Sequence, residues 1–241
     1  MGAKKIKISK KEAQKAKKAE ELAAIPMLSK EWIEEHTNKI LAGLGALLLV
    51  MGLVWGFNAY GASKERRARM EYSKVVQNWP ADDNASSQGL QQIITGLETY
   101  LKEHSGTAPV EDAQLDLARA YFQTRQYENA LKYAQKALDQ RHRSQTLKLL
   151  TQYQLAFIYE ALGKTDEALA QWNALKGTEA PQLSKEAYWN IARLYAKQGN
   201  PAKATENYEL ALKAPGGYPN SALVQTELAS LKLKMNVSGG Q

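Results

Sequence analysis

The sequence predicts an all-α protein, with one N-terminal transmembrane helix followed by a solenoid of paired helices and a capping helix. Three observations lead to this prediction. Residues 40–60 form an uncharged and largely apolar run. Three later segments repeat one pattern at spacings of 38 and 36 residues. Turns that contain glycine or proline separate these segments, whose apolar residues recur with helical period.

The uncharged run has the sequence ILAGLGALLLVMGLVWGFNAY. At about 1.5 Å per residue it forms a helix roughly 31 Å long, which matches the hydrocarbon core of a bilayer. A cleaved signal peptide has a shorter apolar region near the N-terminus, and a buried core helix rarely lacks charge over such a length. We therefore interpret the run as an uncleaved single-span anchor, preceded by an interfacial segment around Trp32.

The net charge of +7 comes from the N-terminal tail, where residues 1–18 hold eight lysines and one glutamate. Lysines beside a membrane anchor indicate a topology signal or a contact with anionic lipids, and not nucleic-acid binding. The tail predicts a cytoplasmic N-terminus and a periplasmic C-terminal region in a bacterial inner membrane. Basic residues within 20 residues of the span favour the opposite orientation, so a cytoplasm-facing repeat region stays open.

The repeats are found in residues 117–138, 155–175 and 191–212, which align on Tyr121, Tyr159 and Tyr195. Each segment has an alanine three residues before the tyrosine and another nine residues after it. Small residues at such positions allow two helix backbones to pack closely. Because no single pair can bury its apolar face alone, the pairs are expected to stack. The spacings predict extended connections at 139–144 and 176–184.

Flanking helices are expected at both ends of the stack. Residues 90–103 are amphipathic and would pair with a helix at 63–79 as a degenerate first repeat. A terminal helix is predicted at 222–235, capped by Asn220 or Ser221 and packed through Leu223, Leu228 and Leu231. The predicted domains are a lysine-rich tail (1–28), the interfacial and transmembrane segment (29–60), the membrane-proximal helix with the degenerate repeat (61–111), three repeats (112–214), and the capping helix with a frayed tail (215–241).

No catalytic, metal or cofactor site is predicted. His36, His104 and His142 lie in separate segments without a second ligand at metal spacing, and each is expected to be solvated or interfacial. The sequence has no glycine-rich phosphate loop and no nucleophile elbow. The lack of cysteine excludes thiol catalysis and agrees with an oxidising compartment. We therefore expect a protein that is not an enzyme.

The repeated small-tyrosine-alanine pattern resembles the tetratricopeptide repeat, whose usual period is about 34 residues. The resemblance implies about three and a half repeats and a groove lined by the first helix of each pair. Aromatic and basic residues there suit an extended or carboxylate-bearing polypeptide. The predicted groove residues are Arg119, Phe122, Tyr153, Phe157, Trp189, Arg193 and Lys197. The alternative is that the aromatic residues only pack against neighbouring helices.

The span also has small residues on one stripe, at Gly45, Gly52 and Gly56. Such stripes let helices approach closely in lipid, so a partner helix or a homodimer through the span is expected. Glycine is common in membrane helices, and chance is the alternative explanation.

The order of tail, span, charged helix and repeats resembles the bacterial inner-membrane family of ancillary Sec translocon subunits (YfgM-like). This resemblance implies a non-enzymatic adaptor whose partners are the translocon, periplasmic chaperones or secreted clients. Two other interpretations are a scaffold of an envelope or cell-division complex and a cytoplasm-facing repeat adaptor.

Overall fold

The structure is a computed structural model that describes residues 14–15, 30–80, 87–140 and 144–238. Every regular element within these ranges is a helix. The chain divides into two compact units, residues 1–63 and 64–241. The all-α prediction is confirmed, whereas the predicted domain boundaries stay predictions.

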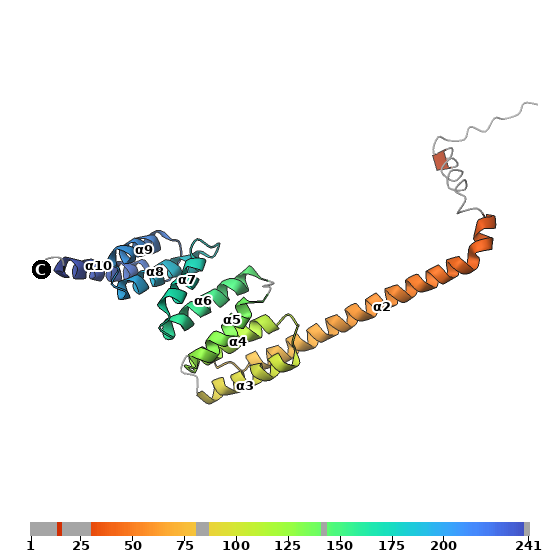
Figure 1. Cartoon of the computed structure of the whole chain (residues 1–241), viewed down its shortest axis with the longest axis horizontal. Coiled ribbons are helices and arrows are strands. Elements are labelled where there is room, and N and C mark those ends of the chain that lie inside the picture. Colours follow the sequence, from red (N-terminus) through yellow and green to blue (C-terminus); the bar gives the residue numbers. More distant parts are fainter. Residues whose placement is uncertain (1–13, 16–29, 81–86, 141–143, 239–241) are drawn as a thin grey trace, which may run out of the picture. The chain divides into compact units, whose positions relative to one another are not determined.

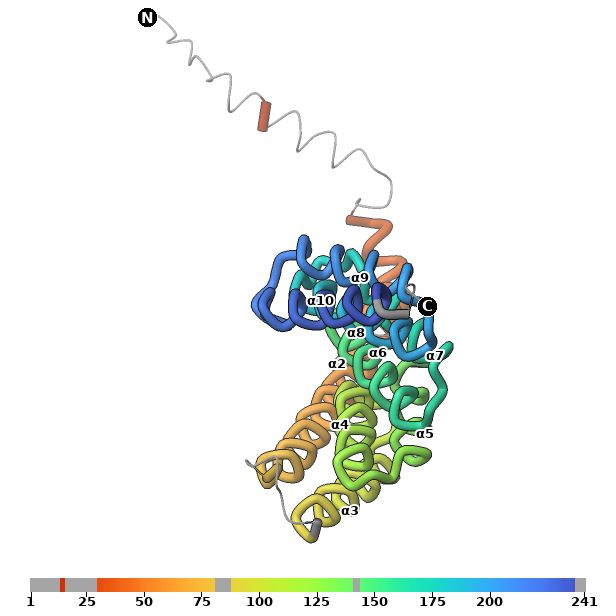
Figure 2. Tube along the Cα trace, turned by 90° about the vertical axis from the view of Figure 1, so that its left-hand side faces the viewer, coloured from red at the N-terminus to blue at the C-terminus, as the bar shows by residue number. Residues whose placement is uncertain are grey.

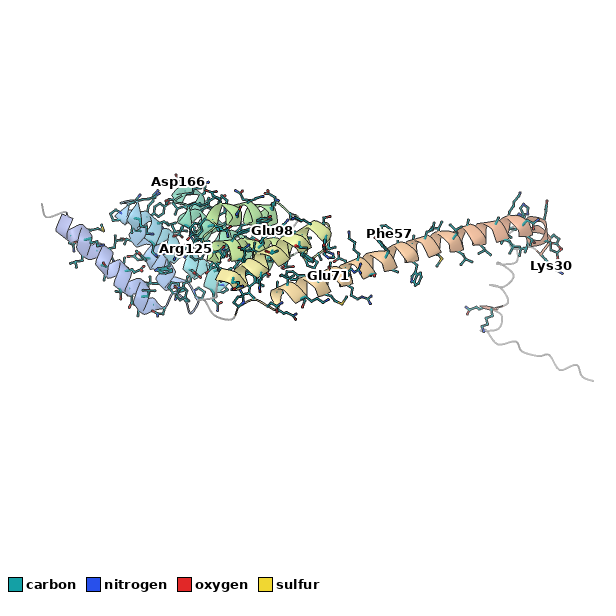
Figure 3. All side chains as sticks on the ribbon, turned by 90° about the horizontal axis from the view of Figure 1, so that it is seen from below. Lys30, Phe57, Glu71, Glu98, Arg125 and Asp166 are labelled. Atoms are coloured by element: carbon teal, nitrogen blue, oxygen red, sulfur yellow. The ribbon has the colours of Figure 1, made fainter. Side chains whose placement is uncertain are left out.

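In the first unit, the described residues belong mainly to the helix α2 (Lys30–Val76), which extends into the second unit. It is the one helix among the described residues that is long and apolar enough to cross a membrane. Its apolar side chains lie exposed, as Figure 3 shows for Phe57, which is 78% exposed. At its start, the ring of His36 stacks on Trp32. A helix surrounded by lipid would expose such side chains.

The second unit is a stack of helix pairs (Figure 1). The last turns of α2 and α3 (Ser87–Glu103) contribute to one apolar core with the next pair. The following pairs are α4 (Val110–Gln123) with α5 (Tyr127–Leu138), α6 (Gln145–Ala161) with α7 (Thr165–Leu175), and α8 (Pro181–Lys197) with α9 (Pro201–Lys213). A final helix, α10 (Ser221–Ser238), packs on α9.

The repeated alanines lie where the paired helices cross. All six are fully buried: Ala118, Ala156, Ala192, Ala130, Ala168 and Ala204. A larger side chain at these positions would push the two backbones apart, because protein interiors have no spare volume. The repeat pattern therefore identified fully buried positions that the two helices of each pair share in one core.

The turn inside each pair has the same backbone conformation. Gly163 and Gly199 have φ angles of 71° and 72°, in the left-handed region. Arg125 occupies the equivalent place in the α4–α5 pair and has a φ of 60°. Glycine adopts this conformation without a steric penalty, whereas arginine does not.

The predicted first pair is present. Ile94 and Leu97 of α3 are almost fully buried in the same core as Ala68 of α2. Gly96 lies against Val75, where an added Cβ would come within 2.8 Å of Val75 Cγ1. This close approach explains a glycine in the middle of α3, where it costs helix propensity.

The capping helix agrees in part with the prediction. The Asn220 side chain accepts a hydrogen bond from the Leu223 backbone N–H at 2.8 Å, so Asn220 is the N-cap. Val224 is fully buried against α9 with Leu228, whereas Leu223 is only half-buried, so its predicted place in the interface was wrong. Val224, Leu228 and Leu231 follow the four- and three-residue spacing of one helix face. The helix continues past residue 235 to Ser238.

The two expected connections differ in outcome. Helix α5 ends at Leu138 and α6 begins at Gln145, which agrees with the predicted bounds, and residues 141–143 between them lie outside the described residues. The α7–α8 connection covers only residues 176–180, so the prediction of a loop to residue 184 was wrong. Pro181 occupies the first turn of α8, where its missing N–H costs nothing, and the helix starts there. The extra residues therefore lengthen α8 and do not lengthen the loop.

Candidate functional site

The seven predicted groove residues all lie on α4, α6 and α8, the first helices of their pairs. Figure 2 shows these helices succeeding one another along the stack, with α5 and α7 beside them. We call the face formed by α4, α6 and α8 the first-helix surface. Binding of a partner by these seven residues stays a prediction, whereas their contacts within the chain are defined by the structure.

On α4, the two predicted residues contact different neighbours. The guanidinium carbon of Arg119 lies 4.9 Å from the centroid of the Trp79 ring, a cation–π distance. Phe122 is half-buried, with its ring centroid 5.5 Å from that of Tyr127. Arg119 itself is exposed, so its charged end is available to solvent.

On α6, Tyr153 and Phe157 form an aromatic cluster with Trp172 of α7. The three ring pairs meet edge to face, with centroids 4.9 to 5.6 Å apart. The hydroxyl of Tyr153 donates to Glu186 of α8 at 3.0 Å. Burial and the neighbouring Glu186 carboxylate raise the pKa of Tyr153, and burial also raises the pKa of Glu186. This cluster joins α6, α7 and α8, and both predicted residues remain half-buried.

On α8, Trp189 contacts the C-terminal part of the chain through a hydrogen bond and a ring contact. Its indole N–H donates to Glu227 of α10 at 2.6 Å, and the ring of Tyr218 meets it edge to face. Arg193 stacks over Trp189 at 4.9 Å and donates to Asn190 at 2.6 Å. The predicted pairing of an aromatic ring with a basic residue is present here. Both side chains also donate hydrogen bonds to other residues of the chain.

Lys197 is exposed, and the structure gives it no contact with the other six residues. The seven side chains thus form two local pairs, and the other three make no described contact with another predicted residue. The structure brings together Tyr153 with Phe157 and Trp189 with Arg193, whereas Arg119 contacts Trp79.

A pocket of about 460 Å³ opens at the other end of the first-helix surface. Its lining comes from the last turns of α2, the start of α4 and the start of α6. We call it the acidic pocket, and its lining residues are Arg69, Tyr72, Ala108, Pro109, Glu111, Asp112, Ser144, Thr146, Leu147 and Leu150. Sequence reasoning missed it, because its walls come from segments far apart in the chain.

Carboxylates gather around the acidic pocket. Tyr72 donates to Asp116 at 2.6 Å, and the backbone N–H of Ala108 donates to Glu65 at 3.1 Å. Burial, together with the charges of Asp116 and Glu111, raises the pKa of Asp112. Burial also raises the pKa of Asp116, although the Tyr72 hydrogen bond opposes that change. The acidic spacing Glu111, Asp112 and Asp116 was the one signal visible in the sequence.

The structure corrects the prediction for His104. This residue is only 7% exposed, its ring stacks on Tyr100, and its Nε2 contacts the carboxylate of Glu71. Glu71 lies on α2, beside α3 (Figure 3). Potential ligand atoms of Glu71, Glu103 and His104 lie within 4.8 Å of one another, and could hold a divalent cation. Arg67 also lies 3.6 Å from Glu71, so an ion-pair network accounts for the same arrangement.

The glycine stripe of the span lies on α2 in the first unit. An added Cβ at Gly45, Gly52 or Gly56 would meet nothing within 4 Å. The stripe is therefore open to another helix, and its use as a contact stays a prediction.

A family model described as a tetratricopeptide repeat-like domain matches residues 30–233. The chain belongs to the tetratricopeptide repeat-like domain family. Tetratricopeptide-like repeats are interaction scaffolds that present a surface to protein partners. The resemblance inferred from the tyrosine-and-alanine pattern is confirmed at this level.

Two solved structures to which this chain is similar are the following. The crystal structure of MamA has 21% sequence identity and a TM-score of 0.45, covering 59% of this chain and 83% of MamA. A Podospora anserina protein described as a kinesin light chain with nearly identical TPR-like repeats has 21% identity and a TM-score of 0.47, covering 70% of this chain and 84% of its own. Among curated proteins, none matches this sequence.

Proposed function

We propose that this protein is a non-enzymatic adaptor of the bacterial inner membrane, anchored by residues 40–60 with its repeats in the periplasm. Its tetratricopeptide-like surface would bind secreted polypeptides or chaperones beside the Sec translocon. The observation that supports this most directly is a first-helix surface of stacked pairs, carrying exposed basic and half-buried aromatic side chains, joined to an apolar helix.

The span supports a contact in the membrane. Gly45, Gly52 and Gly56 leave one stripe of α2 open, and a translocon helix or a second copy of the chain would pack there. The lysine-rich residues 1–28 would remain in the cytoplasm, where lysine favours retention.

Site-specific photocrosslinking in cells tests the partner. The crosslinker is placed at Lys197 and Leu150 on the first-helix surface, with Asp166 of α7 as the exposed control, which Figure 3 labels. We expect secreted polypeptides or chaperones at the first two positions and none at Asp166. In the span, Gly52 is compared with Val54, which points to the opposite side of the helix. Failure to recover translocon components from Gly52 would remove the translocon assignment.

A reporter fused after Gln241 tests the orientation. Activity of a reporter that works only in the periplasm supports the proposal. Activity of a cytoplasmic reporter would establish the inverted adaptor instead. A stable set of envelope or cell-division proteins at Lys197, without translocating chains, would establish the structural scaffold.

A further inference from the structure

The acidic pocket is lined by the carboxylate side chain of Glu111. Glu111 is only 6% exposed and lines the pocket, yet its carboxylate forms no hydrogen bond or ion pair with any residue that the structure describes. Its carboxylate oxygens are not among the fully buried polar atoms, so a ligand that enters the pocket can reach them. Such a group gains strongly when a cation with N–H donors enters the pocket.

The surroundings add negative charge. Asp112 lines the same pocket, and Asp116 and Glu65 lie just behind it through their bonds to Tyr72 and Ala108. Among the described residues, the only cation in the lining is Arg69, and Arg119 acts on Asp116 from behind it. The pocket therefore has an excess of negative charge and attracts a cationic ligand.

The remaining wall is apolar. Leu147, Leu150, Pro109 and Ala108 line it, and Leu150 is 43% exposed. An exposed leucine beside a charged cavity is a suitable contact for the methylene stem of lysine or arginine, or for an apolar neighbour of that residue. A free metal ion would use only the carboxylates, whereas a polypeptide would use both walls.

We infer that the acidic pocket binds a lysine or arginine side chain of a partner polypeptide, with an adjacent apolar residue of the partner on Leu147 and Leu150. The inference rests on the proposed adaptor function and specifies what its surface recognises. The partner's ammonium or guanidinium group donates to Glu111 and Asp112. The aromatic cluster of α6 lies further along the same surface and contacts the following residues of the partner.

Fluorescence anisotropy with the full chain in lipid nanodiscs tests this. The probe is the labelled peptide Gly-Leu-Lys-Leu-Leu-Arg-Leu-Gly, compared with the same peptide carrying glutamate in place of lysine and arginine. We expect the basic peptide to bind and the acidic one not to bind. The double variant E111Q/D112N preserves side-chain shape and should weaken binding by about tenfold or more. L150S should weaken it by about threefold to tenfold, because apolar contact area is lost.

The matched control is D166N/E167Q, which removes the same charge from exposed positions on α7. Equal weakening in this control would reduce the effect to net charge and overturn the proposal, as would unchanged binding in E111Q/D112N with a native thermal transition. Arg141 and Arg143 lie outside the described residues but adjoin Ser144 in sequence. If only R141A/R143A bound the peptide, the chain's own arginines would fill the pocket, and the proposal would be wrong.

The adaptor function can be judged separately. Clients crosslinked at Lys197 despite no binding of the basic peptide would overturn the pocket assignment and retain the adaptor. The absence of any client at Lys197, together with tight binding of the basic peptide, would retain the pocket and reject the proposed partners.

Discussion

The two ends of the first-helix surface differ in what their side chains contact. At the α8 end, Trp189 donates to Glu227 and Arg193 donates to Asn190. At the α4 end, Glu111 lines a pocket of about 460 Å³ and forms no hydrogen bond or ion pair through its side chain with a described residue. The capping helix α10 therefore contacts one end of the surface, while a pocket lined by carboxylates remains open at the other end. We therefore expect substitutions at the α8 end to change stability most, and substitutions at the α4 end to change binding most.

The largest expected effect concerns the closed end. Trp189→Ala removes the hydrogen bond to Glu227 and the contact with Tyr218, which together hold α10. We expect the free energy of unfolding to fall by about 3 kcal/mol, near the lower limit for a tryptophan because the ring is only half-buried. Thermal unfolding of the detergent-solubilised chain, followed by circular dichroism, measures this. Leu150→Ala at the open end is the control and should change stability by less than about 0.5 kcal/mol. Equal losses in both variants would remove the distinction.

A smaller loss is expected at the open end. Tyr72→Phe leaves the half-buried Asp116 carboxylate without its donor, now 2.6 Å away. Hydrogen bonds to charged groups contribute about 1.5 kcal/mol or more, so we expect a loss of that size. The pKa of Asp116 should rise further, because the Tyr72 hydrogen bond lowers it. NMR titration of the carboxyl carbon checks the pKa. Tyr127→Phe, whose hydroxyl makes no described hydrogen bond, should show neither change.

A gain is expected in the turn of the α4–α5 pair. Arg125 has a φ of 60° where the following pairs have Gly163 and Gly199. Arg125→Gly should increase stability by about 0.5–1 kcal/mol, since relief of the left-handed strain exceeds the added entropy of the unfolded chain. Urea unfolding measures the difference. The reciprocal change Gly163→Arg should destabilise, and a loss in both variants would contradict this account.

The smallest effect concerns Asp112. Its pKa is raised in the folded state, so its ionisation above that pKa opposes folding. Asp112→Asn removes this unfavourable ionisation and should raise the midpoint temperature of unfolding at neutral pH. The increase should be small, because solvent screens the charge of the exposed side chain. The gain should shrink as the pH falls through the raised pKa and vanish below the ordinary value of 3.8. Thermal melts between neutral pH and the acid range check this. A gain that persisted below that range would require another cause.

Much of the fold was visible in the sequence because it is local. The alanines before and after Tyr121, Tyr159 and Tyr195 identified the helix crossings, and Asn220 identified the start of α10. Helix periodicity and caps depend on residues three or four apart, so they can be counted along the chain. The loop to residue 184 was mispredicted because Pro181 begins a helix as readily as it ends a loop.

The candidate site was predicted less completely. The sequence identified which helices form the surface, and it suggested the pairing of Arg193 with Trp189. It did not indicate that Glu227 would engage that tryptophan from 38 residues away, nor that Tyr72 and Asp116 would meet across 44 residues. Such contacts depend on the rotation between successive helix pairs, which no local pattern encodes.

By itself, the sequence determined the apolar helix of residues 40–60, the paired-helix repeat and the positions of closest helix contact, since each follows from composition or local period. The tertiary structure alone decided that His104 is buried against Glu71, that Glu227 of α10 meets Trp189, and that Glu111 lines the acidic pocket. The physical reason is distance along the chain: side chains that meet from separate helices depend on how the whole stack packs.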